Sequence, residues 1–323
     1  MRIAAIDVGT NTAQLLVADV ADNGSAGQSL MPRIERIHVA ERFVRLGEGV
    51  DTTGRVNDPA LRRLRDALLD HREAAQALGT ERFVVCATSA SRDAANQDTV
   101  IRFVREETGL PYEILSGEDE AMWSFAAACA PFTDLHDTTL VVDVGGGSTE
   151  LIAGTDPSGQ APRAEQAITS RVSLDIGCIR LTERHFSSQP PTAEDLRAAQ
   201  ATIRSALDHA PIQGDTAPVV IGTAGTATAL AMVDAGPDSI INPLHGTPRT
   251  ISTDRVRHWQ TETLRRSVDE ILALHPRAME HRAPVFVAGV MILDAVLQRV
   301  RADRLHISPF ELRHGLLLRA LAG

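Results

Sequence analysis

The stretch DVGGGSTEL at residues 143–151 has a counterpart in DVGTNTAQL at residues 7–15. Each copy ends an apolar run with an aspartate, continues through a glycine turn and a hydroxyl residue, and then returns to apolar sequence. The alignment pairs Asp7 with Asp143, Gly9 with Gly145, Thr12 with Ser148, and Gln14 with Glu150. An internal repeat of this kind indicates a duplicated structural unit.

The residue types in these two stretches suit the binding of phosphate. Glycines allow the backbone N–H groups of a turn to approach an anion closely, and the neighbouring hydroxyl adds a donor. An aspartate at the end of a strand can bind a hydrated divalent cation through its carboxylate. Two such loops facing each other would therefore form a phosphate clamp.

The surrounding pattern predicts an α/β protein made of two similar halves. Apolar runs and turn signals place strands at 2–8, 15–20, 83–88, 112–115, 139–144, 219–222 and 285–289. Helical spacing places helices at 59–78 and 94–107, one that begins at Ser116, and a last one at about 309–321. We therefore expect a first domain of residues 1–130 plus the C-terminal segment from about 305 to 323. The second domain is expected at 131–304.

Composition narrows the classes of function. The chain has 323 residues, a net charge of −10, and 32 basic residues that are all arginine. The negative charge argues against general nucleic-acid binding, which needs a broad basic surface. The lack of lysine excludes a Walker P-loop, a Schiff-base lysine and a lysine nucleophile. An anionic substrate would need a local pocket of arginines.

The termini and the cysteines point to the cytoplasm. The chain enters a strand pattern at once with MRIAAIDVG, which leaves no room for a signal peptide, and its apolar run VFVAGVMIL is too short for a membrane span. Cys86, Cys129 and Cys178 lack the spacing of a metal site and are predicted to be reduced core residues. We therefore expect neither a membrane nor a nucleic acid among the partners.

Eight motifs in one order give the chain a family resemblance. They are DVGTNT (7–12), RLGEGV (45–50), ATSASRDAAN (87–96), SGEDEA (116–121), DVGGGSTEL (143–151), GCIRLTERHF (177–186), GTAGTATAL (222–230) and SPFELRHGLL (308–317). Together they resemble the exopolyphosphatase and guanosine pentaphosphate phosphatase family. Thr10 and Thr12 stand where that family usually has serine, and Asp119 stands where it usually has glutamate. Each departure keeps the type of functional group.

The resemblance implies a fold and an activity. The implied fold is the duplicated ribonuclease H-like, two-domain α/β fold of the actin, Hsp70 and sugar-kinase superfamily, with an interdomain cleft. The implied enzyme is a Mg²⁺-dependent exopolyphosphatase, with Mn²⁺ left open as a substitute, that releases terminal orthophosphate from inorganic polyphosphate. The chain matches a short form without an added C-terminal helical domain, from which we expect a preference for short chains. A homodimer is left open.

Three other functions stay open at this point. One is hydrolysis of guanosine pentaphosphate (pppGpp), the nearest alternative in the same family. Another is an ATP-dependent kinase, because fold alone does not fix a reaction. The last is a non-enzymatic regulator that binds polyphosphate or a nucleotide.

The resemblance also assigns roles to residues. The glutamate immediately before the alanine of SGEDEA, Glu120, is the expected catalytic residue, whereas Asp119 has a sufficient role in capping its helix. The metal is expected at Asp143 and Glu150, with Asp7 contributing through water. Phosphate binding is expected from Gly9, Thr10, Asn11, Thr12, Arg92, Gly145, Gly146, Gly147, Ser148 and Thr149, with Arg45 and Gly225 as further candidates.

Overall fold

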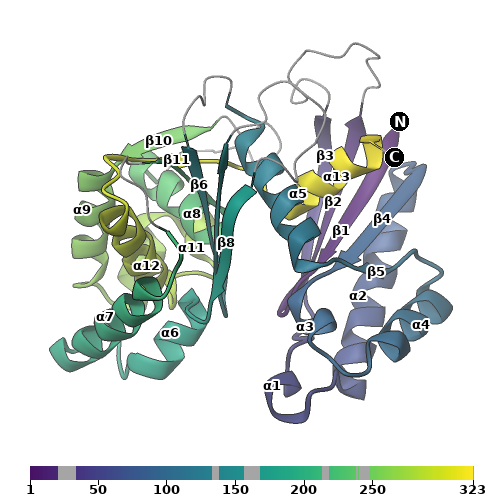
Figure 1. Ribbon diagram of the computed structural model, residues 1–323, viewed down its shortest axis with the longest axis horizontal. Coiled ribbons are helices and arrows are strands. Elements are labelled where there is room, and N and C mark those ends of the chain that lie inside the picture. Colours follow the sequence, from purple (N-terminus) through teal and green to yellow (C-terminus); the bar gives the residue numbers. More distant parts are fainter. Residues whose placement is uncertain are drawn as a thin grey trace. The chain divides into compact units, whose positions relative to one another are not determined.

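The computed structural model describes residues 1–20, 34–132, 138–155, 168–212, 218–237, 239 and 248–322 (Figure 1). The chain divides into two compact units. Of the described residues, unit 1 contains 1–130 and 311–322, and unit 2 contains 131–310. Each unit has its own sheet.

The sheet of unit 1 has five strands in the order β3-β2-β1-β4-β5. They are β1 (Arg2–Val8), β2 (Thr12–Val20), β3 (Ile34–Phe43), β4 (Arg82–Ala87) and β5 (Glu113–Ile114). Strand β2 is antiparallel to both of its neighbours, whereas β4 and β5 continue parallel to β1. The strands expected at 2–8 and 15–20 are therefore confirmed and form a hairpin, in which the second strand begins at Thr12.

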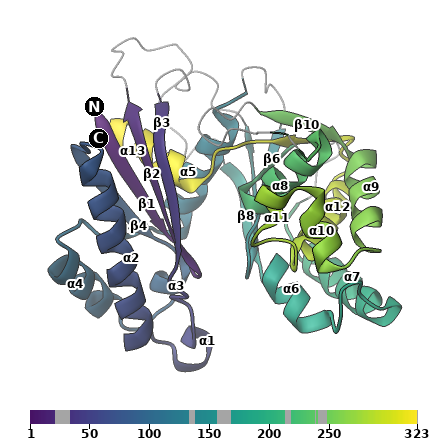
Figure 2. The same ribbon diagram turned by 180° about the vertical axis from the view of Figure 1, so that it is seen from behind.

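Helices cover both faces of this sheet (Figures 1 and 2). They are α1 (Val50–Thr53), α2 (Asp58–Ala77), α3 (Ser89–Arg92), α4 (Gln97–Thr108), α5 (Gly117–Cys129) and α13 (Leu312–Ala322). Because successive side chains of a strand alternate between faces, Ile6 packs in the core with α2, while Ile3 packs in the core with α5 and α13. The side chain of Asn57 accepts a hydrogen bond from the Ala60 N–H and so fixes the start of α2.

The sheet of unit 2 repeats the strand arrangement of the unit 1 sheet. Its strands are β6 (Thr138–Val144), β7 (Thr149–Thr155), β8 (Ile168–Leu174), β9 (Val219–Thr223), β10 (Arg249–Ser252) and β11 (Arg304–Ile307). They lie in the order β10-β11-β9-β6-β7-β8. Read from the other edge, β8-β7-β6-β9-β11 matches β3-β2-β1-β4-β5, and in both sheets the second strand is antiparallel to the first. This is the duplicated ribonuclease H-like α/β fold expected from the sequence.

The helices of unit 2 supply one large apolar core. They are α6 (Cys178–His185), α7 (Ala193–Asp208), α8 (Ala224–Ala235), α9 (Thr253–Thr263), α10 (Val268–Leu274), α11 (Pro276–Met279) and α12 (Phe286–Arg299). In α12 every residue from Phe286 to Leu293 is buried, so this helix lies in the middle of the core.

In the described parts of the chain, no helix combines the length and the apolar character that crossing a membrane requires.

Two sequence-based predictions are wrong. The run VFVAG at 285–289 was expected to be a strand, but it is the start of α12. Short apolar runs do not distinguish a buried strand from a helix that is apolar on all sides. The C-terminal segment of unit 1 begins at 311 and not at about 305, because β11 pairs with β9 in the sheet of unit 2.

The packing of α13 on α5 generates a prediction about Gly315. A Cβ at this position would overlap the backbone carbonyl of Trp123, which has no flexible end that could move aside. Gly315→Ala gains up to about 1 kcal/mol of helix propensity. We expect overpacking to outweigh this gain and to lower the free energy of unfolding by about 1–3 kcal/mol, measured by urea denaturation. A more stable variant would contradict this account of the packing.

Candidate functional site

The two glycine loops, one in each unit, share their hydrogen bonding. In unit 1 the Gly9 N–H donates to the Thr12 carbonyl at 2.9 Å, and in unit 2 the Gly145 N–H donates to the Ser148 carbonyl at 3.0 Å. The strand register is also the same, with Asp7 opposite Gln14 and Asp143 opposite Glu150. The duplication predicted from the sequence thus extends to individual hydrogen bonds.

In each loop several carbonyl groups accept hydrogen bonds, whereas several N–H groups have no partner among the described residues. In unit 2 the carbonyls of Gly145 and Gly146 accept from the N–H groups of Cys178, Ile179 and Arg180 in the first turn of α6, at 2.9–3.0 Å. Within the described part of the chain, the N–H groups of Gly146, Gly147 and Ser148 make no hydrogen bond. A backbone donor without a protein partner is available to water or to an anion.

The loop of unit 1 follows the same rule. Its Thr10 and Asn11 carbonyls accept from the N–H groups of Gly47, Val44 and Arg45, at 2.8–2.9 Å. The N–H groups of Thr10 and Asn11 have no partner among the described residues. The Thr10 hydroxyl lies 3.1 Å from that of Ser89. Both loops therefore carry uncommitted backbone donors, and two successive carbonyls in each loop are bonded within the same unit.

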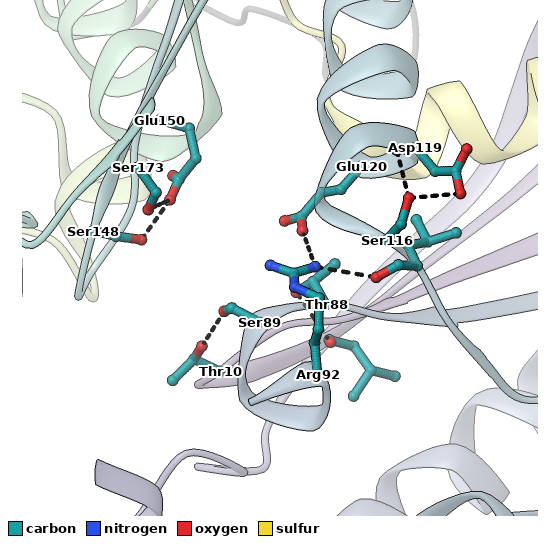
Figure 3. Close-up of polar contacts among 12 residues, drawn as sticks. Thr10, Thr88, Ser89, Arg92, Ser116, Asp119, Glu120, Ser148, Glu150 and Ser173 are labelled. Carbon is teal, nitrogen blue, oxygen red and sulfur yellow. Dashed lines mark hydrogen bonds and ion pairs between the residues drawn. The ribbon is translucent and has the colours of Figure 1, made fainter. Parts of the chain in front are cut away.

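Glu120 and Arg92 face each other in unit 1 (Figure 3). Arg92 ends the short helix α3, and its Nη1 donates to the Glu120 Oε2 at 2.8 Å and to the Leu115 carbonyl at 3.1 Å. The two side chains are 31% and 25% exposed, so both are open to solvent on one side. A carboxylate and a guanidinium that were predicted separately from the sequence thus form one pair.

The start of α5 explains how Glu120 is positioned. The Ser116 side chain accepts a hydrogen bond from the Asp119 N–H at 3.0 Å and donates one to the Asp119 carboxylate at 2.9 Å. Asp119 is thereby committed to the cap, as expected from the sequence. Glu120, one residue further along the first turn, points toward Arg92 instead (Figure 3).

Asp7 lies in an electrostatically unfavourable place. The residue is half-buried, and its Oδ1 is fully buried with no hydrogen-bond partner among the described residues. Burial raises the pKa of Asp7 to about 7, with further increases from the charges of Glu120 and Glu311 and a partial offset from Arg313. An unsatisfied buried carboxylate oxygen is a place where a cation or its bound water fits.

Glu150 is held by two hydroxyl groups in unit 2. Ser148 and Ser173 donate to its Oε1 at 2.6 and 2.9 Å, and Figure 3 shows both pointing toward that oxygen. Ser173 was missed by sequence reasoning, although it lies opposite Glu150 in the β7–β8 register. Asp143 is half-buried on the neighbouring strand. No group of three His, Cys, Asp or Glu side chains in the described ranges could enclose a metal.

Three further candidates occupy different settings. Thr149 is fully buried, and its hydroxyl donates to the Ile176 carbonyl at 2.5 Å, so its side chain belongs to the core of unit 2. Arg45 is exposed, has a positive φ of 45°, and contacts the loop of unit 1 through its backbone N–H. Gly225, in the first turn of α8, lies against the Arg282 guanidinium.

Arg180 was also missed as a functional candidate. Its Nη2 lies 3.6 Å from the point where a Cβ of Gly147 would be. Its motif, GCIRLTERHF, was part of the family resemblance, but sequence spacing does not tell which side of α6 meets the glycine loop.

Comparison with known proteins establishes the family. Residues 20–322 match the Ppx/GppA phosphatase family. The chain belongs to this family.

Relatives with assigned names come from both branches of the family. Exopolyphosphatase 2 of Mycobacterium tuberculosis is 32% identical over 335 residues, covering 100% of this chain and 99% of that protein. Guanosine-5'-triphosphate,3'-diphosphate pyrophosphatase of Photobacterium profundum is 28% identical, covering 97% of this chain and 58% of that protein. The crystal structure of the type II variant of the Aquifex aeolicus Ppx/GppA phosphatase is similar with a TM-score of 0.79, 26% identity and 99% coverage of each chain.

The setting of Asp7 predicts a pH-dependent effect on stability. Ionisation of Asp7 opposes folding as the pH rises from its ordinary pKa of 3.8 to its folded value of about 7, and the penalty is complete above that value. In protein kept free of metal with EDTA, we expect Asp7→Asn to raise the melting temperature more at pH 8 than at pH 5.

Asp19 provides a control of opposite sign on the neighbouring strand. Hydrogen bonds from Arg2 at 2.7–2.8 Å lower the pKa of Asp19. Asp19→Asn should therefore lower the melting temperature at pH 8, by an amount limited by the exposure of this pair. An Asp7→Asn gain that is the same at both pH values would contradict the buried-charge account.

Proposed function

We propose that this protein is an exopolyphosphatase that hydrolyses the terminal phosphoanhydride bond of inorganic polyphosphate and releases orthophosphate. The observation that carries the proposal is the pairing of Glu120 with Arg92 in the unit that also presents the loop donors of Thr10 and Asn11. One group can take a proton from water, and the other can neutralise the charge of a phosphoryl group. Membership of a phosphatase family supports this assignment.

In the proposed reaction, Glu120 orients a water molecule and accepts its proton. The water oxygen forms a bond to the terminal phosphorus, and the bond from that phosphorus to the bridging oxygen breaks. The shortened polyphosphate leaves with the electron pair of that bond. Activation of the nucleophile by a positioned carboxylate is general base catalysis, and most of the remaining barrier is lowered by electrostatic stabilisation of the phosphoryl oxygens.

Arg92 is the proposed phosphate ligand in unit 1. In the ligand-free chain its charge is met by Glu120, with both side chains partly exposed, so the pair is a weak one that an anion can replace. A guanidinium can bind two phosphate oxygens at once. Once Arg92 turns to the substrate, the Glu120 carboxylate is released from its hydrogen bond and is available to the attacking water.

The free N–H groups of each loop are proposed to bind phosphate oxygens in their own unit. Gly146, Gly147 and Ser148 supply donors in unit 2, and Thr10 and Asn11 supply them in unit 1. Gly9 and Gly145 act by shaping the turns. Thr12 and Arg45 contribute backbone structure to the unit 1 loop, and the Gly225 backbone is retained as a weaker candidate.

The small number of candidate carboxylates suits Mg²⁺ better than a metal ion whose ligands all come from the protein. Mg²⁺ keeps several waters and is usually held by one or two carboxylates together with phosphate oxygens. In unit 2, Asp143 and Glu150 would supply that small set, and no three-ligand cluster occurs in the described ranges. Bound there, Mg²⁺ would neutralise charge on the phosphate oxygens. Mn²⁺ has similar ligand preferences and could replace it. Asp7 is retained in unit 1 as a carboxylate that would act through water.

Hydrolysis of pppGpp is the second candidate, favoured by the similarity to the Photobacterium profundum pyrophosphatase. The bond broken is again a phosphoanhydride, so the same groups would act. A side-by-side measurement of orthophosphate release from polyphosphate, pppGpp and ATP ranks the substrates. Transfer of phosphate from ATP to an acceptor other than water would favour the kinase alternative, and binding without turnover would favour the regulator.

The first functional prediction concerns Glu120. We expect Glu120→Gln to lower kcat on polyphosphate by roughly 10²–10⁴, the usual contribution of a general base, with a smaller change in KM. Glu118→Gln is the matched control, because Glu118 is exposed in the same first turn of α5 and feels the same helix dipole. Near-normal turnover of Glu120→Gln, or an equal loss in both variants, would refute the catalytic role.

The second functional prediction concerns the cation. We expect activity to disappear in excess EDTA and to return with Mg²⁺. Asp143→Asn should need a higher Mg²⁺ concentration for half-maximal activity, because a lost carboxylate weakens a site that has few protein ligands. The exposed Asp208 at the end of α7 in the same unit supplies a control of equal charge change, and Asp208→Asn should leave the Mg²⁺ requirement unchanged. Full activity in EDTA would exclude the metal.

A further inference from the structure

The Arg180 residue meets the glycine loop of unit 2 in two ways. Its backbone N–H donates to the Gly146 carbonyl at 3.0 Å. Its guanidinium lies alongside Gly147, with Nη2 3.6 Å from the position of a Cβ there. The side chain is 34% exposed, so its charge lies next to the loop and is still open to solvent.

Asp175 holds this guanidinium from the segment between β8 and α6. Its Oδ1 lies 2.8 Å from the Arg180 Nη1, and its side chain is 92% exposed. An ion pair this exposed contributes little to folding. The pair is therefore readily exchanged for another anion that can use both the guanidinium and the free N–H groups of Gly146 and Gly147.

We propose that Arg180 is a phosphate-binding residue of unit 2 and that Asp175 is its resident counter-ion, which an incoming phosphoryl group displaces. The proposal rests on the loop of unit 2 binding phosphate, as the proposed function requires. The loop supplies neutral donors only, so it needs a cation beside it to bind a multiply charged group well. In a chain without lysine, the side chain that adds a positive charge to that of the proposed Mg²⁺ is an arginine.

The arrangement in unit 2 parallels the one in unit 1. In each unit an arginine is met by a carboxylate of the same unit, Arg92 by Glu120 and Arg180 by Asp175. Arg92 belongs to α3, whose Ser89 contacts Thr10 of the unit 1 loop. The carboxylates differ in their surroundings. Glu120 is 25% exposed and has a proposed chemical role, whereas Asp175 is almost fully exposed and only competes for the arginine. Asp175 thus sets how tightly unit 2 binds an anion.

The test is a double-mutant cycle of binding. The probe is tripolyphosphate with imido bridges, which is not hydrolysed, titrated by calorimetry into the full-length chain with Mg²⁺ at fixed ionic strength. We expect Arg180→Gln to weaken binding by about tenfold, the loss of one charge-assisted contact, and Asp175→Asn to tighten it by about two- to fivefold. In Arg180→Gln protein, Asp175→Asn should then have little effect.

Arg184→Gln is the matched control. Arg184 lies in the last turn of the same helix and is exposed, so the variant has the same net charge as Arg180→Gln. It should bind the probe within about twofold of the wild type, because Arg184 lies at the opposite end of α6 from the turn that meets the loop, and its exposed charge is screened by salt. Arg180→Lys should bind the probe more tightly than Arg180→Gln but less tightly than the wild type, since lysine restores the positive charge but not the two-pronged guanidinium.

Four outcomes would overturn the proposal. They are equal binding by Arg180→Gln and Arg184→Gln, tightening by Asp175→Asn that persists without Arg180, no tightening by Asp175→Asn at all, and no binding of the probe by the wild type. If Arg180→Gln does not fold, Asp175→Asn still decides, because a substitution at so exposed a position leaves the fold intact.

Orthophosphate release from polyphosphate by the wild type is measured separately. If the wild type releases no orthophosphate but the double-mutant cycle gives the expected binding changes, the proposed function is rejected and the binding role of Arg180 is retained.

Discussion

The hydrogen bond that closes each glycine loop is the constraint on which the rest of the site depends. Gly9 to Thr12 in unit 1 and Gly145 to Ser148 in unit 2 turn the chain within a few residues, directly after a strand that ends in aspartate. The turn directs carbonyls toward the following elements of the same unit and leaves N–H groups uncommitted. Anion binding is thus a consequence of where the backbone's own acceptors are used.

The charges near these loops show how a protein of net charge −10 can attract an anion. Arg92 and Arg180 are each paired with a carboxylate, so neither leaves an unbalanced charge in the ligand-free chain. Asp7 is different, because its buried oxygen has no partner in the described residues and its pKa is raised to about 7. Its unfavourable burial reduces stability at a place where the proposed cation would restore it.

Many features of the fold and the candidate site could be predicted from the sequence. The others could not, for physical reasons. The repeated hairpins and the capping of α5 are encoded by residues close together, so spacing alone indicated them. The helical state of 285–289 depends on burial from every side in unit 2, and β11 depends on pairing with β9, which lies about eighty residues earlier. The contact of Arg180 with Gly147 depends on the rotation of α6, which no local pattern specifies. Long-range packing decided each feature that the sequence did not reveal.

The two copies of the loop differ in a way that fits different roles. In the β1–β2 register, Asp7 lies opposite the neutral Gln14, whereas in the β6–β7 register Asp143 lies opposite Glu150, which two serine hydroxyls orient. Unit 2 therefore offers two carboxylates at its loop and unit 1 offers one. Two carboxylates suit a cation, whereas the neutral Gln14 adds no second carboxylate beside Asp7. On the proposed assignment, this difference between the duplicated hairpins gives unit 2 the two direct metal ligands, whereas water activation in unit 1 belongs to Glu120 of α5.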